Sequence, residues 1–145
     1  MSMNYYSITF LGFDPGKDKC GIAVMKSDQT LLFHQVVPSG EAIATIFSLA
    51  KQFPVEKLII GDQTTAKKWI KELEKSGWST EQIAMIDERY SSLEARDRYW
   101  QMYPPKGLQW LIPQGMRQPP RPVDDIVAII LIERYLAKIN APGNT

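Results

Sequence analysis

The chain has only one cysteine and one histidine among its 145 residues. Cys20 has no partner for an intramolecular disulfide bond, and because it lies in a predicted strand we interpret it as a small buried residue. His34 also lies on a predicted strand, and we interpret it as structural. A chain without disulfide bonds is typical of a reducing compartment, so we expect a cytoplasmic protein.

An excess of charge of one sign is also missing, since 17 Lys and Arg stand against 16 Asp and Glu. This balance excludes a strongly basic nucleic-acid-binding protein, so any contact with nucleic acid has to come from a local patch. The longest strongly apolar run, residues 126–132, is far shorter than the about 20 residues of a membrane span. The N-terminus has no basic segment followed by an apolar one. We therefore expect no signal peptide and no membrane association.

The pattern of apolar residues and breaks predicts one α/β domain over residues 1–145. Three strands, 6–13, 21–25 and 30–37, follow one another with short turns and should be antiparallel. Two later strands, 55–60 and 82–86, alternate with helices, which favours parallel pairing. The order predicts a mixed five-stranded sheet, three antiparallel strands and then two parallel ones, with helices on both faces.

Four helices are predicted, and two of them have candidate caps. The first covers residues 41–53 and the last covers residues 123–139. Thr64 or Thr65 can cap a helix that ends at Gly77. Ser91 with Glu94 three residues later fits a capping box that opens a helix ending near residue 102. A proline-rich loop, residues 103–122, with at most one short helical turn, connects this helix to the last one.

Acidic side chains stand at the ends of four predicted elements. They are Asp14 after the first strand, Asp62 after the fourth, Asp87 and Glu88 after the fifth, and Asp124 and Asp125 at the start of the last helix. Because the first, fourth and fifth strands would be parallel, their carboxyl ends would share one edge of the sheet. Clustered carboxylates repel one another unless a cation neutralises them, and all-oxygen sites favour Mg²⁺ or Mn²⁺. Two such ions about 3.5–4 Å apart can hold the attacking and leaving oxygens of a phosphodiester displacement.

Each acid also has a purely local interpretation. Asp14 precedes Pro-Gly and could be the first residue of a β-turn. Asp62 could stabilise the turn after Gly61 or the start of the following helix. The other acids precede or open helices, where negative charge is favourable next to the helix dipole. Spacing alone does not choose between the turns and the metal site.

The segment from residue 96 to 122 combines basic and aromatic side chains. The basic residues are Arg96, Arg98, Lys106, Arg117 and Arg121, and the interleaved aromatic residues are Trp100, Tyr103 and Trp110. This combination suits phosphate contact and base stacking. The alternative is a solvated loop that covers one edge of the core, with Trp110 as its anchor. Trp69 and Trp100 stand at helical spacings that favour core positions.

Three segments together resemble the YqgF family, the Holliday-junction-resolvase-like branch of the ribonuclease H superfamily that is related to RuvC. They are LGFDPGKDKCGIAV, IDERYSSLEA and VDDIVAIILIERYL, in the order that the family has them. The resemblance implies a ribonuclease H-like fold and a metal-dependent nuclease, with Mg²⁺ or Mn²⁺ as cofactor. The substrate of this nuclease would be structured RNA or branched DNA, and its chief role would be maturation of the 16S ribosomal RNA precursor. The protein would be a monomer or a homodimer.

The resemblance also implies roles for individual residues. Asp14, Glu88 and Asp124 would be the catalytic metal ligands, and Lys17 and Arg89 would contact phosphate. The segment IIGDQTTAKKW departs from the family, which usually has Gly-Leu-Pro after the fourth strand, and it places Asp62 where RuvC-type enzymes carry an acid. Asp62 either joins the site or caps the next helix, and we favour the cap. Cys20 and the long proline-rich loop are further departures.

Three other functions are compatible with parts of this pattern. A non-catalytic RNA-binding scaffold on the same fold would bind through Lys106 and Arg117, with Arg121 nearby, and would not need Mg²⁺. A Holliday-junction resolvase would use the same carboxylates on DNA. A kinase-like ATPase begins with a similar Asp-x-Gly hairpin, but its two lobes need more than twice this chain and no second hairpin of this kind is present.

Overall fold

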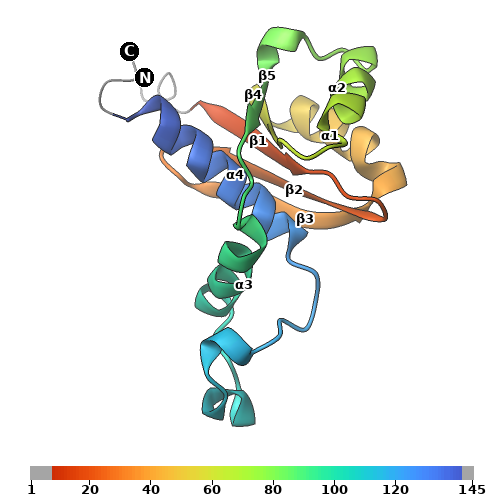
Figure 1. Ribbon diagram of the computed structural model, residues 1–145. Coiled ribbons are helices and arrows are strands. Elements are labelled where there is room, and N and C mark those ends of the chain that lie inside the picture. Colours follow the sequence, from red (N-terminus) through yellow and green to blue (C-terminus); the bar gives the residue numbers. More distant parts are fainter. Residues whose placement is uncertain (1–7, 142–145) are drawn as a thin grey trace.

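The computed structural model describes residues 8–141, which are built around one five-stranded sheet (Figure 1). The strands are β1 (Thr9–Asp14), β2 (Lys19–Lys26), β3 (Leu31–Pro38), β4 (Val55–Gly61) and β5 (Ile83–Ile86), in the spatial order β3-β2-β1-β4-β5. The first three are antiparallel, and β4 and β5 are parallel to β1. The predicted mixed sheet is confirmed; positions 6 and 7 of the first predicted strand lie outside the described residues.

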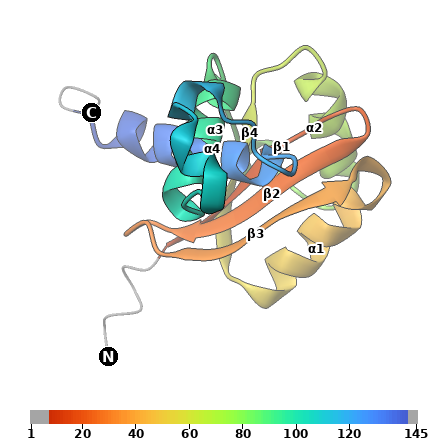
Figure 2. The same ribbon diagram turned by 90° about the horizontal axis from the view of Figure 1, so that it is seen from below.

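Helices cover both faces of the sheet, as predicted. They are α1 (Ala42–Gln52), α2 (Ala66–Lys75), α3 (Ser91–Met102) and α4 (Asp124–Ile139). In Figures 1 and 2, α4 crosses one face while α1 and α2 lie on the other. Successive side chains of a strand point to opposite faces of the sheet. Because helices cover both faces, the central strands are buried on both sides. Within residues 8–141 no helix is long and apolar enough to cross a membrane.

Helix α4 is buried around nearly its whole circumference. Residues 126–132 are all at most 3% exposed. One side of α4 packs on Phe10, Met25 and Ile59 of the sheet, and the other side packs on α3. This burial on two sides explains the continuous apolar run, since a helix that packed on the sheet alone would need apolar residues along one face only.

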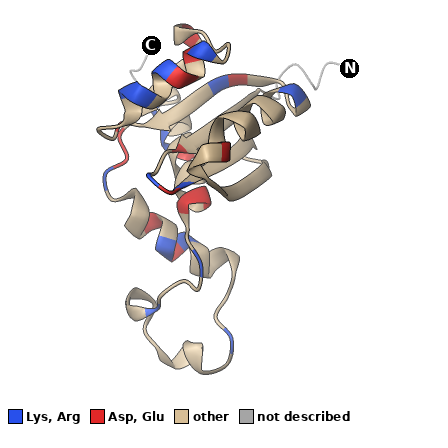
Figure 3. Cartoon of the chain, turned by 90° about the vertical axis from the view of Figure 1, so that its right-hand side faces the viewer, with Lys and Arg blue, Asp and Glu red and all other residues tan. Residues whose placement is uncertain are grey.

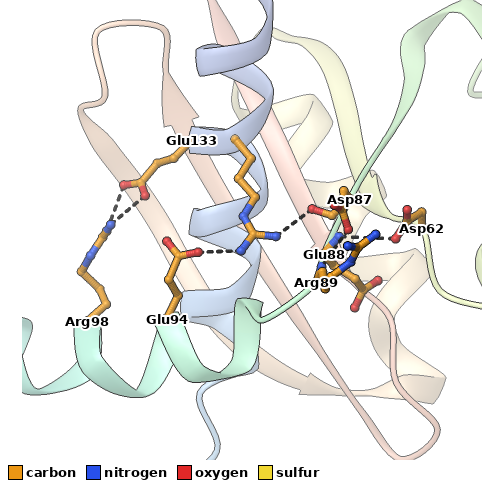
Figure 4. Close-up of polar contacts among 8 residues, drawn as sticks. Asp62, Asp87, Glu88, Arg89, Glu94, Arg98 and Glu133 are labelled. Carbon is orange, nitrogen blue, oxygen red and sulfur yellow. Dashed lines mark hydrogen bonds and ion pairs between the residues drawn. The ribbon is translucent and has the colours of Figure 1, made fainter.

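A bidentate ion pair joins helix α3 to α4. The Arg98 guanidinium donates to both carboxylate oxygens of Glu133, at 2.9 and 2.7 Å (Figure 4). Arg134 of α4 donates to the side chain of Glu94 and, at 2.8 Å, to the backbone oxygen of Asp87. These contacts hold the start of α3, and the turn before it, against the last helix.

The proline-rich loop extends away from the sheet beyond α3 (Figure 1). It contains two 3-10 helices, Gly107–Leu111 and Gln114–Met116, where at most one short helical turn was expected. Trp110 is 62% exposed, so its predicted role as the anchor of the loop is wrong, whereas Trp100 is buried. The Arg117 guanidinium lies over both indole rings, and its Nε donates to the backbone oxygens of Gln109 and Ile112. Arg117 therefore closes the loop on itself.

Three predicted helix caps are wrong. The residue before α3 is Tyr90, in a left-handed conformation with φ of 63°, and Ser91 is a buried helical residue. Glu94 is unavailable for a capping box because Arg134 of α4 holds its carboxylate. Helix α2 begins after Thr65 without any side-chain cap, so neither Thr65 nor Asp62 caps it.

Candidate active site

The carboxylates of Asp14 and Glu88 are joined through the side chain of Gln63. Asp14 ends β1, Gln63 follows β4, and Glu88 follows β5. Gln63 Nε2 donates to Asp14 Oδ1 at 3.1 Å and, in a shorter contact, to Glu88 Oε2. These three strands are parallel neighbours, so residues just past their carboxyl ends meet at one edge of the sheet. The expected convergence of acids at this edge is present for Asp14 and Glu88.

Glu88 lies against the backbone of β4 because position 61 has no side chain. A Cβ at Gly61 would stand 2.2 Å from Glu88 Oε1, so a side chain at position 61 would push the Glu88 carboxylate out of its present place. Asp62 accepts a hydrogen bond from the Glu88 backbone nitrogen at 3.3 Å, as Figure 4 shows. Asp62 therefore orients the Glu88 backbone, a role that was not among those predicted for it.

Asp124, the first residue of α4, completes the group of acids. Its carboxyl group lies close enough to that of Asp14 for the two groups to shift each other's pKa. Burial, together with repulsion from Asp124 and Glu88, raises the pKa of Asp14 to about 8. Burial also raises the pKa of Glu88 and of Asp124. A carboxyl group that is only 7% exposed and faces two other acids is costly to ionise without a cation.

Asp125 belongs to a different cluster from its neighbour Asp124. It is 2% exposed and accepts hydrogen bonds from His34 Nδ1 at 2.7 Å and from Arg121 at 2.9 Å. Hydrogen bonds from these two partners lower the pKa of Asp125 despite its burial. The His34 ring thus supports a buried carboxylate next to the site, which favours its structural interpretation.

The remaining predicted residues of the fifth-strand motif lie in the turn before α3. Asp87 Oδ1 accepts a hydrogen bond from the backbone nitrogen of Arg89 at 2.9 Å, so Asp87 shapes the turn. Arg89 is exposed beside it (Figure 4). Tyr90 follows with 71% of its surface exposed. The turn thus presents a cation and an aromatic ring directly after Glu88.

Basic side chains near the carboxylates come from several elements. Lys17 of the β1–β2 hairpin and Lys68 of α2 line a cavity of about 580 Å³ that Gln63 and Trp69 also border. Lys68 and Gln63 are site residues that the sequence reasoning missed; their only signal was the departure from the family pattern after β4. In the extended loop the cations are few and separated (Figure 3). Lys106 is exposed there, whereas Arg121 is engaged with Asp125.

The donor set suits a hard divalent cation. Three carboxylates approach one another, and Glu88 Oε1 is buried with no hydrogen-bond partner among the described residues. Oxygen-only ligands of this kind are those that Mg²⁺ and Mn²⁺ take. As the side chains stand, no three His, Cys, Asp or Glu residues within 8–141 already form a metal-binding group. The Gln63 amide nitrogen occupies the position between Asp14 and Glu88.

We expect the metal-free protein to lose stability as the pH rises from about 4 to about 8. The folded state keeps the Asp14 proton up to about pH 8, whereas the unfolded chain releases it near the ordinary pKa of 3.8. The folded state therefore binds more protons in this window, and the free energy of unfolding falls with increasing pH. The raised pKa values of Glu88 and Asp124 act in the same direction.

Thermal melting in the presence of a chelator at pH 5, 6.5 and 8 measures this effect. Asp14→Asn should flatten the profile, because the asparagine side chain does not titrate. A melting temperature that rises over the same range would show that Asp14 is ionised in the folded protein.

Comparison with known proteins identifies relatives of this fold. The sequence profile of the family described as "RuvX: Holliday junction resolvase" matches residues 8–138. The structure of Thermus thermophilus RuvC in complex with a Holliday junction substrate is 16% identical, with a TM-score of 0.55 over 94% of this chain and 97% of that one. A second Thermus thermophilus RuvC structure is 14% identical, with a TM-score of 0.56 over 93% of this chain and 98% of that one. No curated protein sequence matches the chain significantly.

Proposed function

The chain belongs to the RuvX family of Holliday junction resolvases, and from this premise we propose that it is a metal-dependent nuclease that hydrolyses phosphodiester bonds in structured nucleic acid. The observation that carries the proposal is the group of three carboxylates at one edge of the sheet. Asp14, Glu88 and Asp124 come from three elements far apart in the sequence, and their burial raises all three pKa values. Carboxyl groups with raised pKa values that gather at the end of a parallel sheet favour a functional site over three separate turns.

Each of these residues has a definite part in the proposed reaction. Asp14, Glu88 and Asp124 would hold Mg²⁺ or Mn²⁺. Bound there, two such cations would neutralise the carboxylates and stabilise the charge on the attacking and leaving oxygens. The protein's own contribution is to keep these acids rigid through Gly61, Asp62 and the start of α4, since small displacements of catalytic groups are costly.

Nucleic acid would be held by groups around this edge. Lys17 and Lys68 line the cavity next to Gln63, and Arg89 follows Glu88 directly, so these three cations suit contacts with phosphates near the cleaved bond. Tyr90 is exposed in a left-handed backbone conformation two residues after Glu88 and suits stacking on an unpaired base. Lys106 and Arg117 would make more distant contacts along the extended loop.

The class of nucleic acid is the finer part of the proposal. The resemblance to the YqgF family favours the 16S ribosomal RNA precursor as substrate. The RuvC neighbour was solved with a Holliday junction, which makes branched DNA the second candidate. The cytoplasmic location and the monomeric or dimeric state stay predictions.

A panel of substrates tests the function directly. We expect the purified protein to cleave a structured RNA spanning the 16S precursor ends, or a four-way DNA junction, in Mg²⁺ or Mn²⁺ but not in a chelator. Linear duplexes of the same sequences are the matched controls for structure specificity. Binding that is equally tight with and without metal, together with no cleavage of any substrate, would overturn the nuclease and leave the RNA-binding scaffold as the function.

A further inference from the structure

We propose that Gln63 is a positioning residue that takes the place of a divalent cation: its amide holds Asp14 and Glu88 together in the metal-free protein and has to leave when the cation binds. The inference rests on the proposed function, because it assigns a resting state to the same carboxylates. It concerns a residue that stands where the family usually has proline. The contacts around the Gln63 side chain carry it.

The orientation of the amide follows from its partners. The end group of Gln63 lies within hydrogen-bonding distance of Asp14 Oδ1 and Glu88 Oε2, and both of these oxygens act as acceptors. An amide oxygen in this position would face two acceptors, so the nitrogen must point toward the acids. Both hydrogens of one NH₂ group are then used, one for each acid. Within residues 8–141, no other hydrogen bond links the side chains of these two acids.

The position of the amide nitrogen is the one that a shared cation would need. A cation between the two carboxylates attracts both of them, and so does an NH₂ group, but the amide carries only partial positive charge. An amide in place of a cation also accounts for the unpartnered Glu88 Oε1. The single amide nitrogen already donates to Asp14 and to Glu88 Oε2, so it has no hydrogen left for Glu88 Oε1. The carboxylates are thus held close together but not yet arranged as a metal-binding group.

Space for the departing side chain is present next to the site. Gln63 is half-buried and borders the cavity of about 580 Å³ that Lys17 and Lys68 also line. The side chain can therefore rotate out of the site without displacing the packed core. It is not needed at the start of α2 either, since no side chain caps that helix. Rotation would move the amide toward the groups that suit phosphate.

Metal binding by Gln63→Ala tests the inference without any measurement of cleavage. We expect the metal-free variant to melt at a lower temperature than the wild type at pH 8, because two acids lose their shared donor. We expect its Mn²⁺ dissociation constant, measured by calorimetry, to fall about tenfold, the factor that corresponds to about 1.4 kcal/mol. Gln63→Glu, which keeps the shape but lacks the donor, should bind Mn²⁺ at least as tightly as Gln63→Ala.

Gln52→Ala is the matched control, since Gln52 is an exposed glutamine at the end of α1. It should leave both the melting temperature and Mn²⁺ binding unchanged. Equal or weaker Mn²⁺ binding by Gln63→Ala, with Asp14-dependent binding by the wild type, would overturn the inference and leave the nuclease proposal intact. No Mn²⁺ binding by the wild type or by either Gln63 variant would overturn the metal-dependent function and this inference with it.

Discussion

Asp14→Asn is expected to abolish metal-dependent cleavage while it stabilises the metal-free protein. Asp14 lies between Asp124 and Glu88, so the loss of its charge removes the central ligand of the proposed site. We expect a decrease in the cleavage rate of more than about 100-fold, beyond the range for changes that touch only the neighbours of a metal ligand. The increase in melting temperature that Mg²⁺ causes in the wild type should disappear as well.

The opposite effect on stability makes this experiment decisive. The asparagine oxygen can still accept the hydrogen bond from Gln63, and the neutral side chain avoids the cost of ionising a buried group beside two acids. At pH 8 without metal we expect a gain in the free energy of unfolding of at least about 1.4 kcal/mol, the equivalent of one pKa unit. A loss of activity through unfolding would lower the melting temperature instead.

Asp18→Asn is the matched control. Asp18 lies in the same β1–β2 hairpin and undergoes the same chemical change, but it is exposed. Its variant should keep wild-type cleavage and wild-type metal stabilisation. Full activity in Asp14→Asn, with normal folding, would show that the buried acids at this edge serve the structure and not the chemistry.

The sheet and its edge of acids were predictable because both follow from local patterns. Alternation and turn residues mark the strands, and the short connections between the first three require antiparallel pairing. Parallel pairing of β1, β4 and β5 then brings Asp14 and Glu88 to one edge without any knowledge of side-chain contacts. The three-segment resemblance added Asp124, which the helical pattern alone could not assign to the site.

What could not be predicted depends on partners distant in the sequence. Ser91 and Glu94 have the spacing of a capping box, but Arg134, 40 residues later than Glu94, binds its carboxylate. Asp125 and His34 are 91 residues apart, and no periodicity relates them. Gln63 carries no charge and matches no motif, so its bridge between two acids is visible only in three dimensions. Prediction from local sequence fails at residues whose side chains form tertiary hydrogen bonds in place of a local helix cap.

Gly21→Ala is expected to be the most destabilising conservative change near the site. Gly21 of β2 is paired in register with Asp14, and the backbone of Asp124 lies directly over it. A Cβ at this position would stand 1.8 Å from the Asp124 backbone oxygen and 2.6 Å from the Asp125 nitrogen. Both are backbone atoms, so the start of α4 would have to move away from the sheet.

Two consequences should follow from this displacement. Overpacking costs about 1–3 kcal/mol, and we expect a clash with two backbone atoms to lie at the upper end of that range. This cost exceeds the gain of about 0.4–1 kcal/mol that Gly→Ala gives by restricting the unfolded chain. We therefore expect thermal melting to show a decrease of about 10 °C. Because α4 carries Asp124, cleavage should also fall about 100-fold, the cost of misplacing a catalytic group by about 1 Å.

Gly40→Ala separates this effect from the general cost of losing a glycine. Gly40 lies in the 3-10 helix Ser39–Glu41, and a Cβ there would meet no atom within 4 Å. Its variant should melt within about 0.5 kcal/mol of the wild type, as exposed substitutions usually do. Wild-type stability in Gly21→Ala would mean that α4 shifts without cost, and the close approach of β2 to α4 would then not be what holds Asp124 beside Asp14.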